Sequence, residues 1–254
     1  MEGIFDTHAH YDDERFDEDR DVLLQTLPEK GVSNVINCGV TYRSSLTTLE
    51  LAHQYDYLYA AIGIHPEDCG GTEESDYDAL LPLYDDPKVV AVGEIGLDYY
   101  WDTVPKDVQI QAFERQLVLA NELNLPVIVH DREAHADTMM LLQKHRPRGV
   151  LHCFSGSVET MQEAVKLGFY IGLGGAVTFK NAKKPLAVAA AVPLDRLLLE
   201  TDCPYMAPVP FRGKRNDSSL IAYVAETIGA VRGMEPQVLI DQCRENAKRL
   251  FQLH

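Results

Sequence analysis

The sequence predicts a (β/α)8 TIM barrel, built as a single domain over residues 1–254. Short apolar segments alternate with longer segments of helical period along the chain, which is typical of βαβ units that form a parallel sheet. A length of 254 residues accommodates eight such units, and single α/β barrels commonly reach about 250 residues. An open, doubly wound parallel sheet is the alternative fold for this pattern.

Eight segments are predicted to be strands because each is a short apolar run bounded by Gly, Pro or Asp. They cover residues 4–8, 34–38, 57–63, 89–95, 126–130, 149–154, 169–173 and 196–201. Helical period predicts helices between them, among others over residues 19–30, 44–54, 107–123, 133–145 and 158–167. No segment is rich enough in Ser and Pro to be a linker, so we expect one domain.

Composition argues against a membrane or secreted protein. The longest segment without Asp, Glu, Lys or Arg has 13 residues, 167–179, whereas a membrane helix needs about 20. The chain starts with an acidic segment where a signal peptide would be basic. The five cysteines are an odd number, and no two lie closer than the 31 positions between Cys38 and Cys69. We therefore expect a cytoplasmic protein without a disulfide framework, a membrane contact or an obligate protein partner.

The formal net charge is −16, from 23 Lys and Arg against 39 Asp and Glu. Such a chain repels nucleic acids at long range, because affinity for phosphate backbones comes mainly from Lys and Arg. A nucleic-acid substrate therefore requires local basic segments.

Histidine and acidic residues stand at the carboxyl ends of several predicted strands, where barrel enzymes place their chemistry. His8 and His10 end the first strand, and because side chains alternate along a strand, both imidazoles can bind one ion. Four further residues follow the apolar residues of other strands: Glu94, His130, His152 and Asp202. Each alone could be an ordinary polar strand end, but together they indicate a metal centre.

Several imidazoles and two carboxylates at one rim must repel one another or share cations. Two divalent ions about 3.5–4 Å apart, bridged by a carboxylate, are the arrangement that this set supports. Such an ion lowers the pKa of bound water from about 16 toward about 7 and neutralises charge on phosphoryl oxygens. Asp202 can bind an ion and also accept the proton of the water, because an ionised carboxylate is only an acceptor. Imidazole ligands favour Zn, Mn or Fe over Mg.

Several motifs follow one another along the chain: His8-Ala9-His10, Gly63-Ile64-His65-Pro66, Gly93-Glu94-Ile95-Gly96-Leu97-Asp98, Val129-His130, His152-Cys153-Phe154-Ser155-Gly156, Glu200-Thr201-Asp202-Cys203-Pro204-Tyr205 and Arg212-Gly213-Lys214-Arg215-Asn216. Over nearly the whole chain they resemble the TatD family of metal-dependent deoxyribonucleases. The resemblance implies a (β/α)8 barrel and a phosphodiesterase that acts on DNA with divalent metal ions. Two residues depart from the family pattern, Tyr11 after the first motif and Asp217 after the last, and we expect them to affect substrate fit.

The resemblance also implies which residues bind metal. His8, His10, Glu94 and Asp202 would hold one ion, and Glu94, His130 and His152 would hold the second. Glu94 and Asp202 are then the catalytic residues. The family is usually discussed with Mg, whereas the ligands favour softer metals, so Mg, Mn and Zn all stay open.

Candidate substrate-binding residues lie on the loops that follow the strands. His65 contacts substrate or a ligand, or is a buried histidine bonded to backbone. Tyr99 and Trp101 could stack bases or merely cover the barrel wall. The segments 180–184 and 212–215 are basic and follow the seventh and eighth strands, where many barrels bind phosphate; they could also be solvated surface. The cations assigned to phosphate binding are Lys183, Arg212, Lys214 and Arg215.

The function expected from these residues is a 3′–5′ exonuclease that hydrolyses single-stranded DNA, with the polarity taken from the resemblance alone. The same centre could instead act on a carbonyl group, in a D-aminoacyl-tRNA deacylase or a small-molecule amidohydrolase. A barrel that only binds metal or a partner is the non-enzymatic alternative. It predicts a damaged ligand set, and the sequence has no such gap.

Overall fold

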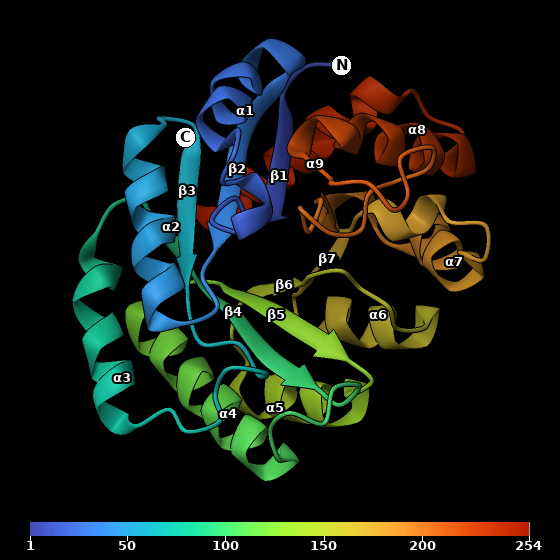
Figure 1. Ribbon diagram of the computed structural model, residues 1–254. Coiled ribbons are helices and arrows are strands. Elements are labelled where there is room, and N and C mark those ends of the chain that lie inside the picture. The colour runs from blue at the N-terminus through green and yellow to red at the C-terminus, as the bar shows by residue number, and fades with distance from the viewer. Residues whose placement is uncertain (254) are drawn as a thin grey trace.

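The computed structural model, which describes residues 1–253, is a barrel of parallel strands surrounded by helices (Figure 1). The eight strands pair in chain order: β1 (Ile4–Ala9), β2 (Val32–Cys38), β3 (Leu58–Ile62), β4 (Val89–Asp98), β5 (Val127–Arg132), β6 (Gly149–Leu151), β7 (Tyr170–Leu173) and β8 (Leu197–Leu199). Beyond β8, Cys203 forms a parallel bridge with Ala9 of β1, which nearly closes the ring. The predicted (β/α)8 barrel is confirmed.

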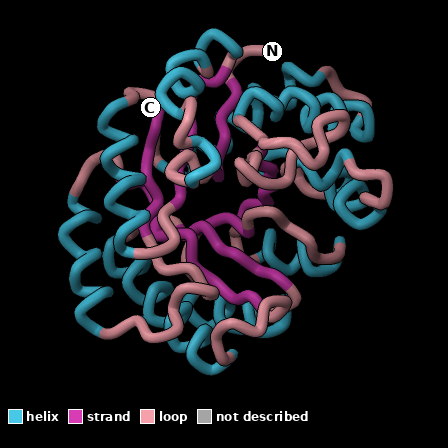
Figure 2. The backbone as a smooth tube through the Cα atoms, viewed as in Figure 1, coloured by secondary structure: helices cyan, strands magenta, loops and turns pink. Residues whose placement is uncertain are grey.

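The helices form the outer layer, and the strands lie inside them (Figure 2). They are α1 (Arg20–Thr26), α2 (Tyr42–Gln54), α3 (Glu74–Leu80), α4 (Lys106–Leu123), α5 (His135–His145), α6 (Val158–Lys166), α7 (Lys183–Ala191), α8 (Ile221–Arg232) and α9 (Pro236–Phe251). Within residues 1–253, none of these helices combines the length and the apolar character needed to cross a membrane.

Three element boundaries differ from the sequence prediction for identifiable reasons. The helix predicted over 19–30 ends at Thr26, and a 3-10 turn follows from Pro28, which has no N–H for helical bonding. The sixth and eighth strands end early, at Leu151 and Leu199. Cys153 and Asp202 have φ values of 42° and 58°, and a residue in the left-handed region turns the chain out of the strand.

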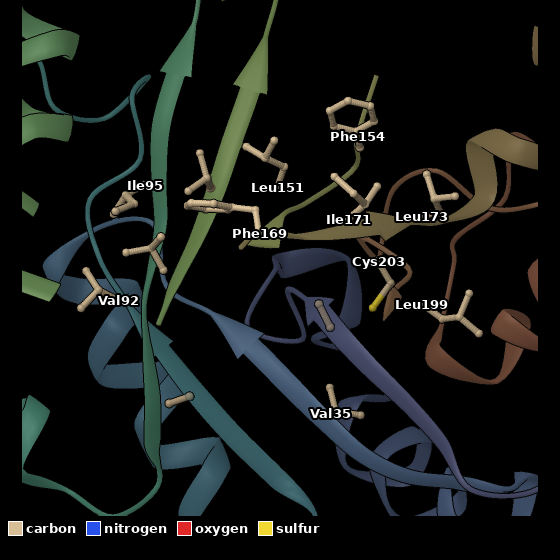
Figure 3. Close-up of a cluster of buried hydrophobic side chains, with 14 of the residues drawn as sticks. Val35, Val92, Ile95, Leu151, Phe154, Phe169, Ile171, Leu173, Leu199 and Cys203 are labelled. Atoms are coloured by element: carbon tan, nitrogen blue, oxygen red, sulfur yellow. The ribbon is translucent and has the colours of Figure 1, made fainter. Parts of the chain in front are cut away.

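The hydrophobic core has two parts, one on each face of the strands. The outer part packs the strands against the helices; Val92, Leu151 and Phe169 are among the side chains drawn in Figure 3. The inner part contains residues that alternate with these along the strands, and Phe251 of α9 stacks on Phe5 with ring centroids 6.4 Å apart. Along the inward face, apolar residues therefore give way to the predicted metal ligands toward the carboxyl ends of the strands.

A buried carboxylate, Asp6, ties the first strand to the chain beyond the eighth. It accepts hydrogen bonds from the backbone N–H of His8 (3.2 Å) and of Thr201 (3.0 Å). It also accepts from the hydroxyls of Thr201 (2.6 Å) and Ser218 (2.7 Å). These contacts fix the segment that carries Asp202 against the segment that carries His8.

Replacing Asp6 with Ala should lower the free energy of unfolding by about 3–5 kcal/mol, because it leaves buried N–H donors without acceptors. Asp6→Asn keeps an acceptor and the shape, and should lose less than half as much. Urea unfolding with a chelator in every sample measures both values without a contribution from metal. A loss below about 1 kcal/mol for Asp6→Ala would show that the network does not stabilise the fold.

Candidate metal centre

Glu94 of β4 is buried, and five histidines lie within 3.5 Å of its two carboxylate oxygens. Oε1 lies 2.7 Å from Nε2 of His152 and 2.8 Å from Nδ1 of His130. Oε2 lies 3.3 Å from Nε2 of His8 and 3.4 Å from Nε2 of His10. The two oxygens thus face two different groups of imidazoles, as a carboxylate that bridges two ions would.

The first group consists of His8, His10, Asp202 and Oε2 of Glu94. The Nε2 atoms of His8 and His10 are 3.0 Å apart, and Oδ1 of Asp202 is 3.7 Å and 3.6 Å from them. Ligand atoms about 2.1 Å from a tetrahedral or octahedral ion lie about 3.0–3.4 Å apart. The two imidazoles and Oε2 of Glu94 match this spacing, and Oδ1 of Asp202 lies slightly farther away. The chemistry of all four donors suits one divalent ion.

The second group surrounds Oε1 of Glu94. Nδ1 of His130 and Nε2 of His152 are 3.3 Å apart, which again fits ligands of one ion. Nε2 of His65 is 3.5 Å from the same oxygen. His65, Glu94 and His130 thus form a possible ligand set, so His65 lies closer to the metal centre than the sequence indicated.

The other ring nitrogen of His8, His10 and His130 has a partner behind it. Nδ1 of His10 is 2.9 Å from the carbonyl of Cys38, whose sulfur is 3.5 Å from Nδ1 of His8. Nε2 of His130 is 2.9 Å from Oδ2 of Asp98. Such partners hold the orientation and tautomer of a metal-binding imidazole, and they raise its basicity.

Glu200 lies behind His152 as a charged neighbour rather than a hydrogen-bond partner, and the sequence pattern above did not single it out. Its Oε1 is 3.7 Å from Nδ1 of His152 and accepts the N–H of Cys153. The side chain of Glu200 is fully buried and packs against Gly172. A Cβ at position 172 would overlap the Glu200 carboxylate, so only glycine fits there. The sequence did contain a signal for Glu200. It precedes Asp202 by two positions at the end of a predicted strand, and residues two apart on a strand face the same side.

Electrostatics keep both acidic ligands ionised. Burial alone would raise the pKa of Glu94, but the surrounding imidazoles, His152 and His8 foremost, hold it well below its usual range. Burial opposes ionisation of Asp202 too, and the neighbouring imidazoles of His10, His8 and His152 together lower its pKa. The centre therefore presents two negatively charged ligands at neutral pH.

A cleft of about 510 Å³ leads from the surface to these residues. Asp202 faces it with 21% of its side chain exposed, whereas Glu94 lies at the floor with 4%. Five carboxylates line the cleft among the described residues: Asp12, Asp13, Glu67, Glu94 and Asp202. Arg132 is the one Lys or Arg among the lining residues in this part of the chain. The cleft itself is therefore acidic, and bound cations would offset that charge.

The predicted substrate-binding residues do not all lie in this cleft. His65 lines it. Tyr99 does not, because its hydroxyl donates to Asp137 (2.8 Å) and Lys106 covers its ring; its neighbour Trp101 lines the cleft instead. Arg132 lies two positions after His130 on the same strand face, a signal that the sequence analysis did not use.

The two basic segments follow β7 and β8, as expected, although Lys183 and Lys184 begin α7. Neither segment lines the cleft. Lys183, Arg212 and Lys214 are exposed, and the guanidinium of Arg212 lies 4.4 Å from the ring centre of Phe179. Arg215 forms a two-point ion pair with Asp19, at 2.6 and 2.7 Å. Its charge is therefore already paired.

Tyr11 is fully buried, and its hydroxyl lies 2.7 Å from that of Ser218. Asp217 caps the 3-10 turn that begins at Ser218. The expectation that Tyr11 affects substrate fit was wrong, because the ring packs into the protein beneath the loop rather than into the cleft.

A parallel (β/α)8 barrel with adjoining groups of His and carboxylate donors at the carboxyl ends of its strands is the architecture of a metal-dependent hydrolase. Residues 5–252 match the family described as TatD related DNase. The chain belongs to the TatD family of metal-dependent hydrolases.

Relatives cover the chain end to end. The metal-dependent hydrolase YabD of Bacillus subtilis, described as uncharacterized, is 43% identical over 99% of this chain and 100% of its own. The 3′-5′ ssDNA/RNA exonuclease TatD of Salmonella typhimurium is 33% identical over 98% of this chain and 99% of its own. The crystal structure of YJJV, a TatD homolog from Escherichia coli, superposes with a TM-score of 0.93 at 35% identity, covering 99% of both chains.

Metal affinity should increase with pH up to about pH 9. Burial alone would lower the pKa of His130, but its hydrogen bonds with Asp98 and Glu94 raise it to about 9. Below that pH an ion must displace the proton from Nδ1 of His130. The apparent Kd should therefore rise by up to tenfold for each pH unit that the pH falls, for this proton alone. Calorimetric Zn²⁺ or Mn²⁺ titrations from pH 6 to pH 9, in buffers of different ionisation enthalpy, measure the affinity and the protons released.

Asp98→Asn provides the control, since it removes the charge that favours the protonated ring and should move the pH dependence to lower pH. An affinity that stays constant from pH 6 to pH 9 would mean that His130 is not a ligand.

Proposed function

We propose that this protein is a two-metal nuclease that removes nucleotides from single-stranded DNA, acting from the 3′ end. The observation that carries the proposal is Glu94, whose two oxygens face separate donor groups at the floor of an open cleft. His8, His10, Glu94 and Asp202 would hold one ion, and Glu94, His130 and His152 the other. When bound, two such ions lower the pKa of water and offset charge on a phosphoryl group.

Asp202 is the proposed general base. It is ionised, and it is the more exposed of the two acidic residues at the centre. Its hydrogen-bonded backbone holds it in place: the N–H donates to the carbonyl of His8 (2.9 Å), and the carbonyl accepts from Tyr205 N–H (2.8 Å). A fixed, ionised carboxylate beside the reacting phosphate can take the proton of the attacking water.

The depth of the centre favours a flexible strand end as substrate. The proposed ligands lie toward the carboxyl ends of the strands, and β4 and β5 extend beyond Glu94 and His130. A scissile phosphate must therefore descend below the rim to within about 2 Å of an ion. Duplex DNA, with a persistence length of about 50 nm, does not bend its backbone into such a cleft. The Salmonella relative is named as a 3′-5′ exonuclease of ssDNA and RNA, which supports the polarity and leaves RNA as a further substrate.

The basic segments are proposed to hold the rest of the strand. Lys183 at the start of α7 and Arg212 and Lys214 on the loop after β8 are exposed, outside the acidic cleft. Phosphates that trail from the bound end would meet these cations rather than the carboxylates. Arg215 takes part only if its pair with Asp19 opens.

The test compares linear and covalently circular single-stranded DNA of one sequence, with duplex DNA, RNA and D-aminoacyl-tRNA alongside, under Mg²⁺, Mn²⁺ or Zn²⁺. Linear DNA labelled at its 3′ end should release labelled mononucleotide, and the circle should persist. Asp202→Asn should lower kcat at least about 100-fold with little change in KM, because it removes a proton acceptor and nearly preserves shape.

Equal degradation of circle and linear strand would refute action at an end. Hydrolysis of D-aminoacyl-tRNA in place of every phosphodiester would assign the centre to deacylation. A defect of Asp202→Asn mainly in KM would make Asp202 a binding residue.

A further inference from the structure

We infer that Trp101 and Tyr205 form two base-stacking platforms on opposite sides of the cleft, which bind the nucleotides on either side of the scissile phosphate. The inference rests on the proposed function and specifies how the cleft recognises its substrate. Apart from the histidines, Trp101 and Tyr205 are the aromatic residues that line the cleft within residues 1–253. Both residues are exposed to solvent, Trp101 by 47% and Tyr205 by 42%.

Trp101 is attached to one side of the metal centre. Its backbone N–H and that of Tyr100 donate to Oδ1 of Asp98, at 3.0 and 2.9 Å. The other oxygen of Asp98 is 2.9 Å from Nε2 of His130. A single carboxylate therefore positions both a metal-binding imidazole and the exposed indole.

Tyr205 is attached to the other side. Its N–H donates to the carbonyl of Asp202 (2.8 Å), and its own carbonyl accepts from Asn216 (2.8 Å). Its hydroxyl donates to Asp13 (3.0 Å), which also lines the cleft. The ring is thus held at a fixed place beside the proposed base.

The order of the strands sets the two rings on opposite sides. Trp101 follows β4 and Tyr205 follows β8, and these strands are four positions apart in a ring of eight. A strand end that enters between them meets one ring on each side of the ions. Base stacking on aromatic rings tolerates any sequence, because every base has a π-face.

An arginine side chain packs near each of the two rings, Trp101 and Tyr205. The guanidinium of Arg132 lies 3.9 Å from the ring centre of Tyr100 and 5.5 Å from that of Trp101. That of Arg15 lies 4.4 Å from the ring centre of Tyr205. A planar guanidinium can stack and still bind phosphate, so these two cations would hold the backbone where the cleft is otherwise acidic.

Trp101 is the single tryptophan of the sequence, so its fluorescence reports on one platform directly. The probe is a phosphorothioate-linked deoxythymidine trimer, which resists hydrolysis, titrated into the metal-loaded protein. A trimer of abasic residues with the same phosphates separates stacking from charge, and calorimetry measures binding independently of fluorescence. The thymidine trimer should quench Trp101, and the abasic trimer should bind about tenfold more weakly without quenching.

Tyr205→Ala and Arg132→Ala should each weaken trimer binding about tenfold, while Tyr205→Phe, which keeps the ring, should bind nearly as the wild type. The matched control is Arg115→Ala. It removes an arginine stacked 4.2 Å from the ring centre of Tyr77, a pair of the same kind away from the cleft, and should leave the affinity unchanged. Circular dichroism verifies that each variant is folded.

Bound trimer that leaves Trp101 unquenched, or equal affinity of Tyr205→Ala and Arg115→Ala, would overturn the inference. If the wild type nevertheless digests single-stranded DNA, the proposed function survives and the platforms alone are refuted. A wild type that neither binds the trimer nor digests DNA would refute both.

Discussion

The burial of one ionised carboxylate, Glu94, among five histidines is the constraint on which the rest of this structure depends. A buried charge is costly unless it is paired, and side chains from four other parts of the barrel converge on its two oxygens. Parallel strands make this convergence possible, because a closed barrel brings the carboxyl ends of distant segments to one rim. The division of the histidines between Oε1 and Oε2 gives the site its two halves.

The protein beneath the ligands explains why the arrangement is fixed. Asp98 and Cys38 each contact the far ring nitrogen of a histidine in the candidate metal centre, and Glu200 lies 3.7 Å from that of His152. Asp6 joins the two segments that carry His8 and Asp202. Asp98 also accepts a hydrogen bond from the backbone N–H of Trp101, in the cleft wall. The same few buried hydrogen-bonding groups therefore fix the side chains of the candidate metal centre and the position of the cleft wall.

The barrel and most of the candidate metal ligands could be predicted from the sequence. The other features could not, and the reasons are physical. The alternation of strands and helices identified the barrel, and the position of His and acidic residues at strand ends identified the candidate ligands. A parallel barrel places the carboxyl ends of all its strands at one rim, so residues far apart in the sequence come together there. The orientations of Tyr99 and Tyr11 could not be read from the sequence, because loop conformation and a partner far along the chain, Asp137 or Ser218, decide which way each ring points. Arg132 and Glu200 carried a two-residue periodicity signal beside a ligand, which is the feature to search for in similar chains.

The central claim is that Glu94 bridges two ions, and electron paramagnetic resonance of the protein loaded with two equivalents of Mn²⁺ tests it most directly. Two Mn²⁺ ions about 3.5–4 Å apart and joined by a carboxylate are magnetically coupled, so the account predicts the multiline spectrum of an exchange-coupled pair. Replacing Glu94 with Ala should abolish that coupling and leave the six-line pattern of isolated ions. A six-line spectrum from the wild-type protein, with two ions bound per chain, would contradict the account.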